Sequence, residues 1–406
     1  MIHIIIGANF GDEGKGMTTA CVTQYQKVTS KNDSIIIKYS GGAQAAHTVN
    51  NIVNHQYGSG DAPTYLHDTF IFNPMLLARE YKDRLNIAKP RQLFVNENVL
   101  VTSPYDIFVN QVKETIRGDS KYGSCGLGIW ETIRRKDKVT LEDVFILDKK
   151  DLAEKLSTGY YKLKEALSTL EIPLPGQFVD IDLKEAFNDW YNITMNCYSD
   201  KVFELVGENS APIDVLLRDR DLIFEGSQGL LLDDTLSPFP MEYRTPTSVC
   251  SKVPLKLLKD LKRDDDINTW YTTRTYFTRH GAGPFPTEQP TLGDKFLDKT
   301  NKPNNWQGSL RFGRWDQKTF EKMIKLDREY YEGYSGLASS GISITYGGET
   351  DFRFLINSTS GMDATMDLSV DNYNVCLFGN QNVESGRIIK SYTGSIQSLA
   401  KTAGLF

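Results

Sequence analysis

Short apolar runs rich in β-branched residues recur along the chain, and most are followed by stretches with helical spacing. The first run, residues 2–6, shows no alternation of apolar and polar positions, which is typical of a strand buried on both faces. We expect further strands at residues 34–40, 92–101, 221–229, 270–277, 341–348 and 373–379. Helices are expected at residues 104–117, 150–170, 182–205, 252–262 and 316–333. Strands that alternate with helices predict an α/β fold with a mostly parallel central sheet, helices on both faces and long functional loops.

Nothing in the sequence marks a boundary between domains. The 406 residues contain no internal repeat, no low-complexity segment and no linker rich in proline or serine. We therefore expect a single large domain over residues 1–406, since α/β domains often exceed the usual domain size. One polar stretch, residues 291–317, predicts a long surface loop, and such loops are often functional.

Composition and charge exclude several classes of protein. Hydrophobic residues make up 40% of the chain and charged residues 24%, which is typical of a globular protein. The net charge of −6 gives no general attraction for nucleic acid, so we expect no nucleic-acid partner. Five cysteines without a C-x-x-C pair argue against a disulfide framework or a zinc site and favour the cytoplasm. The N-terminal apolar run is too short for a signal peptide or a membrane span, so no membrane is expected.

Candidate chemistry begins directly after the first predicted strand, in the segment GANFGDEGKGM, residues 7–17. A glycine-rich loop between a strand and a helix predicts a phosphate site, because backbone N–H groups and the helix N-terminus attract anions. Lys15 adds a mobile positive charge. Asp12 is unusual in such a loop, and it could either bind Mg²⁺ together with phosphate oxygens or take a proton from a bound nucleophile. An ordinary turn between a strand and a helix is the alternative.

Three other segments carry polar groups near predicted strand ends. The segment GGAQAAHTV, residues 41–49, contains His47, for which we expect a catalytic or phosphate-contacting role. The segment GSCGLGIW, residues 123–130, is a second possible anion loop, with a flexible surface loop as the alternative. Gln228 in EGSQG follows a strand, and its amide could orient an oxygen. The remaining histidines are expected to be structural: His3, His55, His67 and His280.

Taken together, these segments resemble adenylosuccinate synthetase. The family pattern G-D-E-G-K-G-K is matched at residues 11–17, with Met17 in place of the last lysine. The patterns G-G-N-N-A-G-H-T-V, G-T-T-G-R-G-I-G and E-G-A-Q-G are matched at residues 41–49, 123–130 and 225–229. The pattern Y-T-T-R-V-G-x-G-P-F-P-T-E is matched at residues 271–288 with an insertion. The matches keep the family order over about residues 1–320, and the resemblance is weak past residue 330.

The resemblance implies a two-step ligase reaction that depends on Mg²⁺. A nucleoside triphosphate would phosphorylate the 6-oxo group of a purine monophosphate, and L-aspartate would then displace that phosphate. Asp12 would remove the N1 proton and bind Mg²⁺ together with the carbonyl of Ala46. His47 would stabilise charge on the phosphoryl group, and Gln228 would hold the activated 6-oxygen. Arg134 would reach the nucleotide of the neighbouring subunit in a homodimer.

The resemblance also implies binding residues for each substrate. The triphosphate would contact Gly11, Glu13, Gly14, Lys15, Gly16, Met17 and Thr48. The acceptor nucleotide would contact Asp12, Gln44, Ala45, Ala46, Ser124, Cys125, Arg134, Gln228, Thr245 and Ser309, with Tyr243 and Arg244 competing for the place of Thr245. Aspartate would contact Asn305, Trp306, Gln307, Gly308, Ser309 and Arg311. The donor base would contact Ser340, Gly341, Ser343, Gly379 and Asn380.

Three departures from the family pattern bear on the identity of the substrates. Ser309 replaces an arginine beside the ribose hydroxyl, which suggests a deoxyribose. The segment from Ser340 to Ser343 replaces a T-K-L-D pattern whose Asp pairs with guanine, which favours ATP or dATP over GTP as the donor. Gln44 replaces an asparagine in the loop over the acceptor base.

These departures resemble the viral branch of the family. Its members join aspartate to dGMP and give N6-succino-2-amino-2′-deoxyadenylate for phage DNA that contains 2-aminoadenine, so the protein would act in the host cytoplasm. The first alternative is the ordinary reaction of IMP, aspartate and GTP, which Asp12 favours because ordinary synthetases have it. The second is a GTPase-like nucleotide switch, but the sequence has no clear N-K-x-D-like motif.

Overall fold

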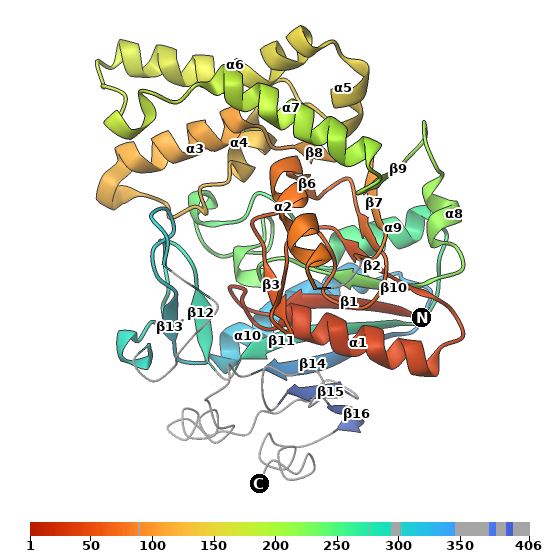
Figure 1. Cartoon of the computed structure of the whole chain (residues 1–406). Coiled ribbons are helices and arrows are strands. Elements are labelled where there is room, and N and C mark those ends of the chain that lie inside the picture. The colour runs from red at the N-terminus through yellow and green to blue at the C-terminus, as the bar shows by residue number, and fades with distance from the viewer. Residues whose placement is uncertain are drawn as a thin grey trace.

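One sheet runs through the computed structural model, which describes residues 1–87, 90–274, 276–293, 301, 303–345, 373–378 and 387–392 (Figure 1). Its described strands, in spatial order, are β16 (Arg387–Tyr392), β15 (Tyr373–Phe378), β14 (Ala338–Thr345), β11 (Ile267–Arg274), β1 (Ile2–Gly7), β10 (Asp221–Glu225), β2 (Ser34–Lys38), β5 (Thr64–Leu66), β7 (Leu93–Asn96) and β9 (Glu204–Val206). Neighbouring strands are parallel except β15 and β16 at one end. The mostly parallel sheet predicted from the sequence is confirmed.

Helices and short strand pairs surround this sheet. The helices are α1 (Lys15–Thr29), α2 (Pro74–Leu85), α3 (Pro104–Arg117), α4 (Ile129–Arg134), α5 (Leu141–Ile146), α6 (Lys149–Thr169), α7 (Leu183–Ser199), α8 (Ile213–Leu217), α9 (Lys252–Asp260) and α10 (Gln317–Arg328). The short strands pair as β3 (His47–Val49) with β4 (Ile52–Asn54), β6 (Ile71–Phe72) with β8 (Leu100–Val101), and β12 (Phe277–Arg279) with β13 (Arg311–Gly313). No helix in the described ranges has the length and apolar character needed to cross a bilayer.

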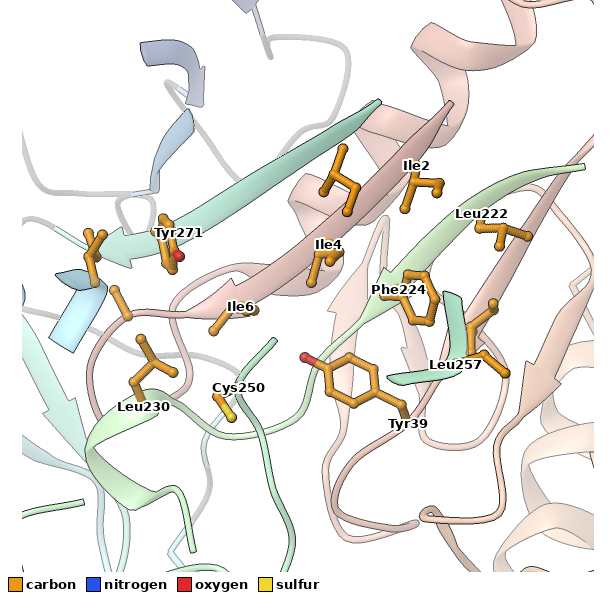
Figure 2. Packing of buried hydrophobic residues seen from close by; sticks show 14 of the residues in the cluster. Ile2, Ile4, Ile6, Tyr39, Leu222, Phe224, Leu230, Cys250, Leu257 and Tyr271 are labelled. Carbon is orange, nitrogen blue, oxygen red and sulfur yellow. The ribbon is translucent and has the colours of Figure 1, made fainter. Parts of the chain in front are cut away.

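Both faces of the sheet are covered by helices, as the unbroken apolar run of β1 predicts. Ile2, Ile4 and Ile6 belong to a buried cluster that includes residues of α9 and α10, and Figure 2 shows them on the same side as Leu257. Ile5 belongs to a separate buried cluster with residues of α1. Because side chains of a strand alternate between its two faces, a strand covered on both sides is apolar at every position.

A second layer, formed by α3, α5, α6 and α7, packs beyond the β7 and β9 end of the sheet (Figure 1). The indole N–H of Trp190 in α7 donates to the carbonyl of Thr102, at 2.9 Å, and ties this layer to the start of α3. A capping box at the start of α3 joins Ser103 and Asp106, and such caps stabilise a helix start by about 1 kcal/mol. The Nδ2 of Asn110 in α3 donates to the Ser124 hydroxyl at 3.0 Å, so this layer positions the predicted second anion loop.

The structure differs from the sequence prediction in several respects. The strand predicted at residues 92–101 divides into β7 and β8, because Asn96 accepts hydrogen bonds from the backbone N–H groups of Val99 and Asn98 and turns the chain. The strand β10 lies between β1 and β2, so the first two strands of the sequence are not neighbours in the sheet. Helices α2, α5 and α8 and strand β5 were not predicted, and the helix predicted at residues 182–205 ends at Ser199 and is followed by strand β9. A single domain over residues 1–406 stays a prediction.

Candidate active site

Loops from the carboxyl ends of β1, β2 and β10 meet at one edge of the sheet. The backbone N–H of Leu231, after β10, donates to the carbonyl of Asn9, after β1, at 2.8 Å. The Ser227 hydroxyl donates to the carbonyl of Ser40, after β2, at 2.6 Å. The Nδ2 of Asn9 reaches sideways to the Thr273 hydroxyl in β11, at 3.0 Å. The carboxyl edge of a parallel sheet is where open α/β proteins bind ligands, so these loops form the candidate site.

Close packing of these loops explains the glycine at position 16. A Cβ added to Gly16 would lie 2.6 Å from the Cβ of His47 and 2.9 Å from the Ser59 hydroxyl oxygen. A Ser or Thr at this position, as in the commoner phosphate loops, would push the second loop away from helix α1. Gly11 has a φ of +101°, and an added Cβ would lie 3.0 Å from the backbone of Gln228. This steric constraint depends on contacts with distant residues, so the sequence of the loop alone does not show it.

Asp12 stands at the tip of the first loop with a φ of 58°, in the left-handed region. Its Oδ2 accepts hydrogen bonds from Nη2 of Arg274, at 2.8 Å, and from Nδ2 of Asn301, at 2.7 Å. Its backbone carbonyl accepts a third hydrogen bond, from Nε of Arg274, at 2.5 Å. Its second carboxylate oxygen, Oδ1, has no hydrogen bond within the described part of the chain, and the side chain is 27% exposed. One oxygen is therefore held in place, while the other is available to a ligand.

The groups available for Mg²⁺ are few. Among the described residues, no three His, Cys, Asp or Glu side chains gather as a metal site. Asp12 could contribute one carboxylate oxygen, and Ala46, whose carbonyl is the other expected ligand, is an exposed residue on the neighbouring loop. A site with so few protein ligands fits Mg²⁺, which keeps several waters and takes its other ligands from substrate phosphates.

Behind the loop, Glu13 and Lys15 form a buried pair of ionisable groups. A Cβ added to Gly7 would lie 2.6 Å from Oε2 of Glu13 and 3.0 Å from Nζ of Lys15, so both side chains converge on the end of β1. Burial raises the pKa of Glu13 to about 7, although the charge of Lys15 opposes this rise. Burial also lowers the pKa of Lys15, against the pull of Glu13 and Asp12. An arriving phosphate would favour the charged form of Lys15 and offset the cost of its burial.

Met17 and Thr48, both expected at the triphosphate, differ in their surroundings. Met17 belongs to the buried cluster of α1 with Ile5 and Trp270, so its side chain fills the core and only its backbone is close to the loop. Thr48 is exposed in β3. Gly11, Glu13, Gly14, Lys15 and Gly16 lie in the loop and the first turn of α1, and their contact with a triphosphate stays a prediction.

His47 is held by a carboxylate that the sequence reasoning did not assign. Its Nδ1 lies 2.5 Å from Oε1 of Glu225, the last residue of β10. Glu225 also accepts hydrogen bonds from the backbone N–H and hydroxyl of Ser59, at 2.9 and 2.7 Å, and lies 3.9 Å from Nζ of Lys38. The sequence signal that could have indicated Glu225 is a charged residue at the end of an apolar strand.

The pKa values of this pair determine which nitrogen of His47 carries its proton. Burial alone would raise the pKa of Glu225, but Lys38, His47 and Ser59 outweigh it and lower the pKa to about 2. Glu225 is therefore ionised, and Nδ1 of His47 donates to it. Burial lowers the pKa of His47, although Glu225 opposes this, so the ring is neutral at neutral pH and its Nε2 is left to face a ligand.

A cavity of about 440 Å³ opens beside these loops. Seven of the residues predicted to bind the acceptor or aspartate line it: Gln44, Ser124, Cys125, Arg134, Gln228, Thr245 and Gln307. Tyr243 and Arg244, the two alternatives to Thr245, also line it, so the cavity does not show which of the three residues binds the acceptor. His280 lies in the same wall, although the sequence reasoning had expected it to be structural. His3, by contrast, is buried and accepts a hydrogen bond from the indole of Trp270, which agrees with a structural role.

Two amide oxygens in the cavity wall are buried without a partner. Oε1 of Gln44 and Oε1 of Gln228 accept no hydrogen bond from any described residue. Gln228 also has a φ of 45°, and strained backbone of this kind is commonest at functional sites. An unpaired buried acceptor costs about 1–3 kcal/mol, so a ligand with matching donors would be favoured here.

The two adjacent arginines after the second anion loop differ in their surroundings. Arg134 is exposed, stacks over the Trp130 ring at 4.1 Å and lies 3.7 Å from the sulfur of Met241 at the cavity. Arg135 is buried and pairs with Asp106, with Nη1 2.5 Å from Oδ2. Arg134 is thus the one free to contact a ligand or a second subunit.

The predicted aspartate loop lies near the cavity, but its arginine is already engaged. Arg311 forms a two-pronged ion pair with Glu288, at 2.8 and 2.5 Å, and its Nη1 donates to the carbonyls of Gly281 and Gly283. Trp306 packs on Gly126, where an added Cβ would lie 2.5 Å from the indole. Ser309, Asn305 and Gly308 are not part of the cavity wall. Ser309 and Asn305 are exposed, and Gly308 is half-buried. Ala45 also lies outside this wall.

The residues predicted for the donor base are not brought to a loop. Ser340, Gly341 and Ser343 lie within β14, whereas its carboxyl end is Thr345. Ser343 is fully buried, and its hydroxyl lies 2.7 Å from that of Thr18 in α1. Gly379 and Asn380 lie outside the described residues.

Comparisons with known proteins agree with the motif order. A family model described as adenylosuccinate synthetase matches residues 4–320. The adenylosuccinate synthetase of Halothermothrix orenii is 28% identical over 334 residues, which cover 77% of this chain and 71% of that protein. The adenylosuccinate synthetase of Geobacter sulfurreducens is 27% identical over 362 residues, which cover 86% of this chain and 78% of that protein.

Two solved structures share the fold. One is the fully ligated adenylosuccinate synthetase of Plasmodium falciparum, with a TM-score of 0.56 and 16% identity, covering 98% of this chain and 89% of that one. The other is the succinoaminodeoxyadenylate synthetase (PurZ) of cyanophage S-2L, bound to dGMP and to dATP as an energy donor, with a TM-score of 0.58, 15% identity, and coverage of 99% and 98%. The family model spans most of the chain and includes every loop of the candidate site. The chain therefore belongs to the adenylosuccinate synthetase family and is a purine nucleotide–aspartate ligase.

Proposed function

We propose that this ligase joins L-aspartate to the 6-position of dGMP, with ATP or dATP as the phosphoryl donor. The product is N6-succino-2-amino-2′-deoxyadenylate, a precursor of 2-aminoadenine in phage DNA, made in the host cytoplasm. The observation that carries the choice of guanine is the buried, unpartnered Oε1 of Gln44 in the cavity wall. Guanine has a 2-amino donor that hypoxanthine lacks, and an unpaired buried acceptor discriminates against the base without that donor.

The other parts of the proposal have separate support. The cyanophage S-2L enzyme, which shares the fold, is bound to dGMP and dATP, and this supports a deoxynucleotide acceptor and an adenine donor. Ser309, which suggested a deoxyribose, is exposed and lies outside the cavity wall. The proposal of a deoxyribose is therefore supported mainly by the cyanophage enzyme.

The first step is transfer of the γ-phosphoryl group to the 6-oxygen. Asp12 takes the N1 proton, which makes the 6-oxygen nucleophilic, and Arg274 and Asn301 hold its carboxylate in place. Lys15 and the backbone N–H groups of the first loop hold the phosphates. When bound, Mg²⁺ would neutralise phosphate charge, with Asp12 and the Ala46 carbonyl as its protein ligands.

His47 and Gln228 act on the atoms that gain charge. The triphosphate raises the pKa of His47, and the resulting imidazolium, stabilised by Glu225, donates its Nε2–H to the phosphoryl oxygen. The Gln228 amide holds the 6-oxygen. In the second step the amino group of aspartate attacks C6 and phosphate leaves with the 6-oxygen. Arg134, exposed at the cavity, contacts the nucleotide of the partner in a homodimer.

The ordinary reaction of IMP with GTP is the second candidate. The curated relatives are named adenylosuccinate synthetase, and Asp12 matches the ordinary family pattern. A nucleotide switch without ligase activity has no use for the cavity or for the loops that line it.

The test is a substrate matrix with the Gln44→Met variant. Wild-type protein, aspartate and Mg²⁺ are incubated with dGMP, GMP or IMP and with ATP, dATP or GTP, and the succinylated product is measured. We expect kcat/KM for dGMP to exceed that for IMP, and Gln44→Met to lower it roughly 10–100-fold while IMP changes little. The exposed Gln177→Met variant is the matched control. Product from IMP but not from dGMP would refute the acceptor assignment.

A further inference from the structure

Arg279 is a buried cation in the wall of the acceptor cavity. It ends β12, is 2% exposed and lines the 440 Å³ cavity. Its guanidinium carbon lies 4.6 Å from the ring centre of Phe10 and 5.5 Å from that of Phe239. Aromatic faces attract a guanidinium and hold it in one orientation, but they leave its N–H donors to find acceptors elsewhere.

The hydrogen bonds of Arg279 do not use all of its donors. Nε donates to the carbonyl of Ala282 at 3.3 Å, and Nη2 donates to the carbonyls of Ala282 and Tyr243 at 3.0 and 3.4 Å. Nη1 is buried and has no hydrogen-bond partner among the described residues. Burial, together with the charge of Arg311, lowers the pKa of Arg279 to about 10, although Glu288 opposes this, so the group stays charged at neutral pH. A buried charge without a counterion is costly, and such groups are found paired or at ligand sites.

The paired strands β12 and β13 carry two arginines, Arg279 and Arg311, and one neighbouring carboxylate, Glu288, so one positive charge is left over. Arg279 in β12 stands directly opposite Arg311 in β13. Like charges at opposed positions repel each other. Glu288 pairs with Arg311 through both of its carboxylate oxygens, and the carbonyls of Gly281 and Gly283 take a further donor of Arg311. The uncompensated charge is therefore that of Arg279, at the cavity.

We propose that Arg279 binds a carboxylate of L-aspartate through Nη1. The acceptor's 5′-phosphate has other candidate partners on other segments, at Ser124, Cys125 and Thr245. Arg311, the arginine expected from the sequence to bind aspartate, already donates to Glu288 and to two backbone carbonyls. The proposal rests on the ligase activity but not on the choice of acceptor, because aspartate is a substrate with either dGMP or IMP.

The experiment compares Arg279→Ala and Arg279→Lys with Arg314→Gln, which changes an exposed arginine directly after β13 whose Nε donates to Gln289. We expect Arg279→Ala to raise the KM for aspartate at least tenfold and to leave the KM values for acceptor and donor within about threefold. Added guanidinium should restore part of the lost aspartate affinity in Arg279→Ala, which a purely structural role would not allow. Arg279→Lys keeps the charge and should give a smaller rise, and Arg314→Gln should behave as wild type.

Two results would overturn the proposal: an unchanged KM for aspartate, or a rise confined to the KM for the acceptor nucleotide, which would assign Arg279 to the phosphate. If Arg279→Ala melts below the assay temperature, Arg279→Lys and its aspartate KM decide the question alone. Each assay is run with whichever acceptor the wild type turns over. A failure of the dGMP assignment is therefore seen in the wild type and is separate from a failure of the Arg279 assignment.

Discussion

Replacement of Glu225 by glutamine tests how the structure prepares His47. Glu225 is fully buried, accepts from Nδ1 of His47 at 2.5 Å and lies 3.9 Å from the equally buried Nζ of Lys38. Glutamine keeps the shape of the side chain and can still accept from Ser59, but it loses the negative charge. The change therefore leaves Lys38 buried without a carboxylate and removes the anion that supports a protonated His47.

The stability cost follows from the pKa of Glu225. The ordinary value of 4.5 falls to about 2 in the folded protein, and this difference corresponds to about 3 kcal/mol of stability at neutral pH. Removing one member of a buried ion pair typically costs a similar amount, about 3–5 kcal/mol. Because the folded pKa is depressed, the contribution is complete above about pH 4.5 and is lost as the pH falls toward 2. Between pH 7 and pH 3.5 the wild type should lose roughly 1.4 kcal/mol that Glu225→Gln does not.

The assays are denaturant unfolding at several pH values and a pH–rate profile. We expect Glu225→Gln to be about 3 kcal/mol less stable at pH 7, to have a kcat roughly 10–100-fold lower, and to lose activity at a lower pH than the wild type as the pH rises. The shift in pH follows because Glu225 raises the pKa of His47. The exposed Glu204→Gln, on β9 of the same sheet, is the control. Unchanged stability, or lower activity with an unshifted pH profile, would refute this reasoning.

Three further predictions test the loop and the two arginines. Gly16→Ala places a Cβ 2.6 Å from that of the histidine in the second loop, so we expect roughly 100-fold lower kcat and a loss of about 1–3 kcal/mol in unfolding experiments. Asp12→Ala should lower turnover roughly 10²–10⁴-fold and leave triphosphate binding, measured by calorimetry, within about threefold; full activity would contradict its role as the base. Arg135→Met leaves Asp106 buried and unpaired and should cost about 3–5 kcal/mol, whereas Arg134→Met should keep stability within about 0.5 kcal/mol and raise the KM for the acceptor. Equal stability of these two variants would contradict the different environments of the arginines.

Several features of the site could be predicted because they depend on neighbouring residues. The strand, loop and helix around residues 7–17 follow from an apolar run, closely spaced glycines and helical spacing. The helix at residues 104–117 was predicted with its observed bounds, since Ser103 and Pro104 mark its start and Gly118 its end. Ser124 and Gln228 were singled out from a glycine-rich loop and a strand end, whereas Gln44 followed from the motif resemblance alone.

Other features could not be predicted because the sequence contains more than one equivalent candidate. The insertion in the Y-T-T-R segment leaves two Thr-Arg pairs, at residues 273–274 and 278–279, and the pattern does not distinguish them. In the fold, Arg274 holds Asp12 and Arg279 lies in the cavity wall. The segment from Ser340 to Ser343 was matched to the T-K-L-D pattern of the family by resemblance, but the strand register puts it inside β14 and not at its carboxyl end.

The sequence by itself determined the local chemistry of this protein: a phosphate loop with a carboxylate at its tip, a histidine loop, and an order of motifs that identifies the ligase family. These properties depend on residues within a few positions of one another, where spacing and backbone preference decide the structure. Only the tertiary structure decided how these groups are held and which of them are free. Glu225 lies 178 positions from His47, and Arg274 lies 262 positions from Asp12. Contacts over such distances depend on strand order and burial, which arise when the whole sheet packs and have no counterpart in local sequence.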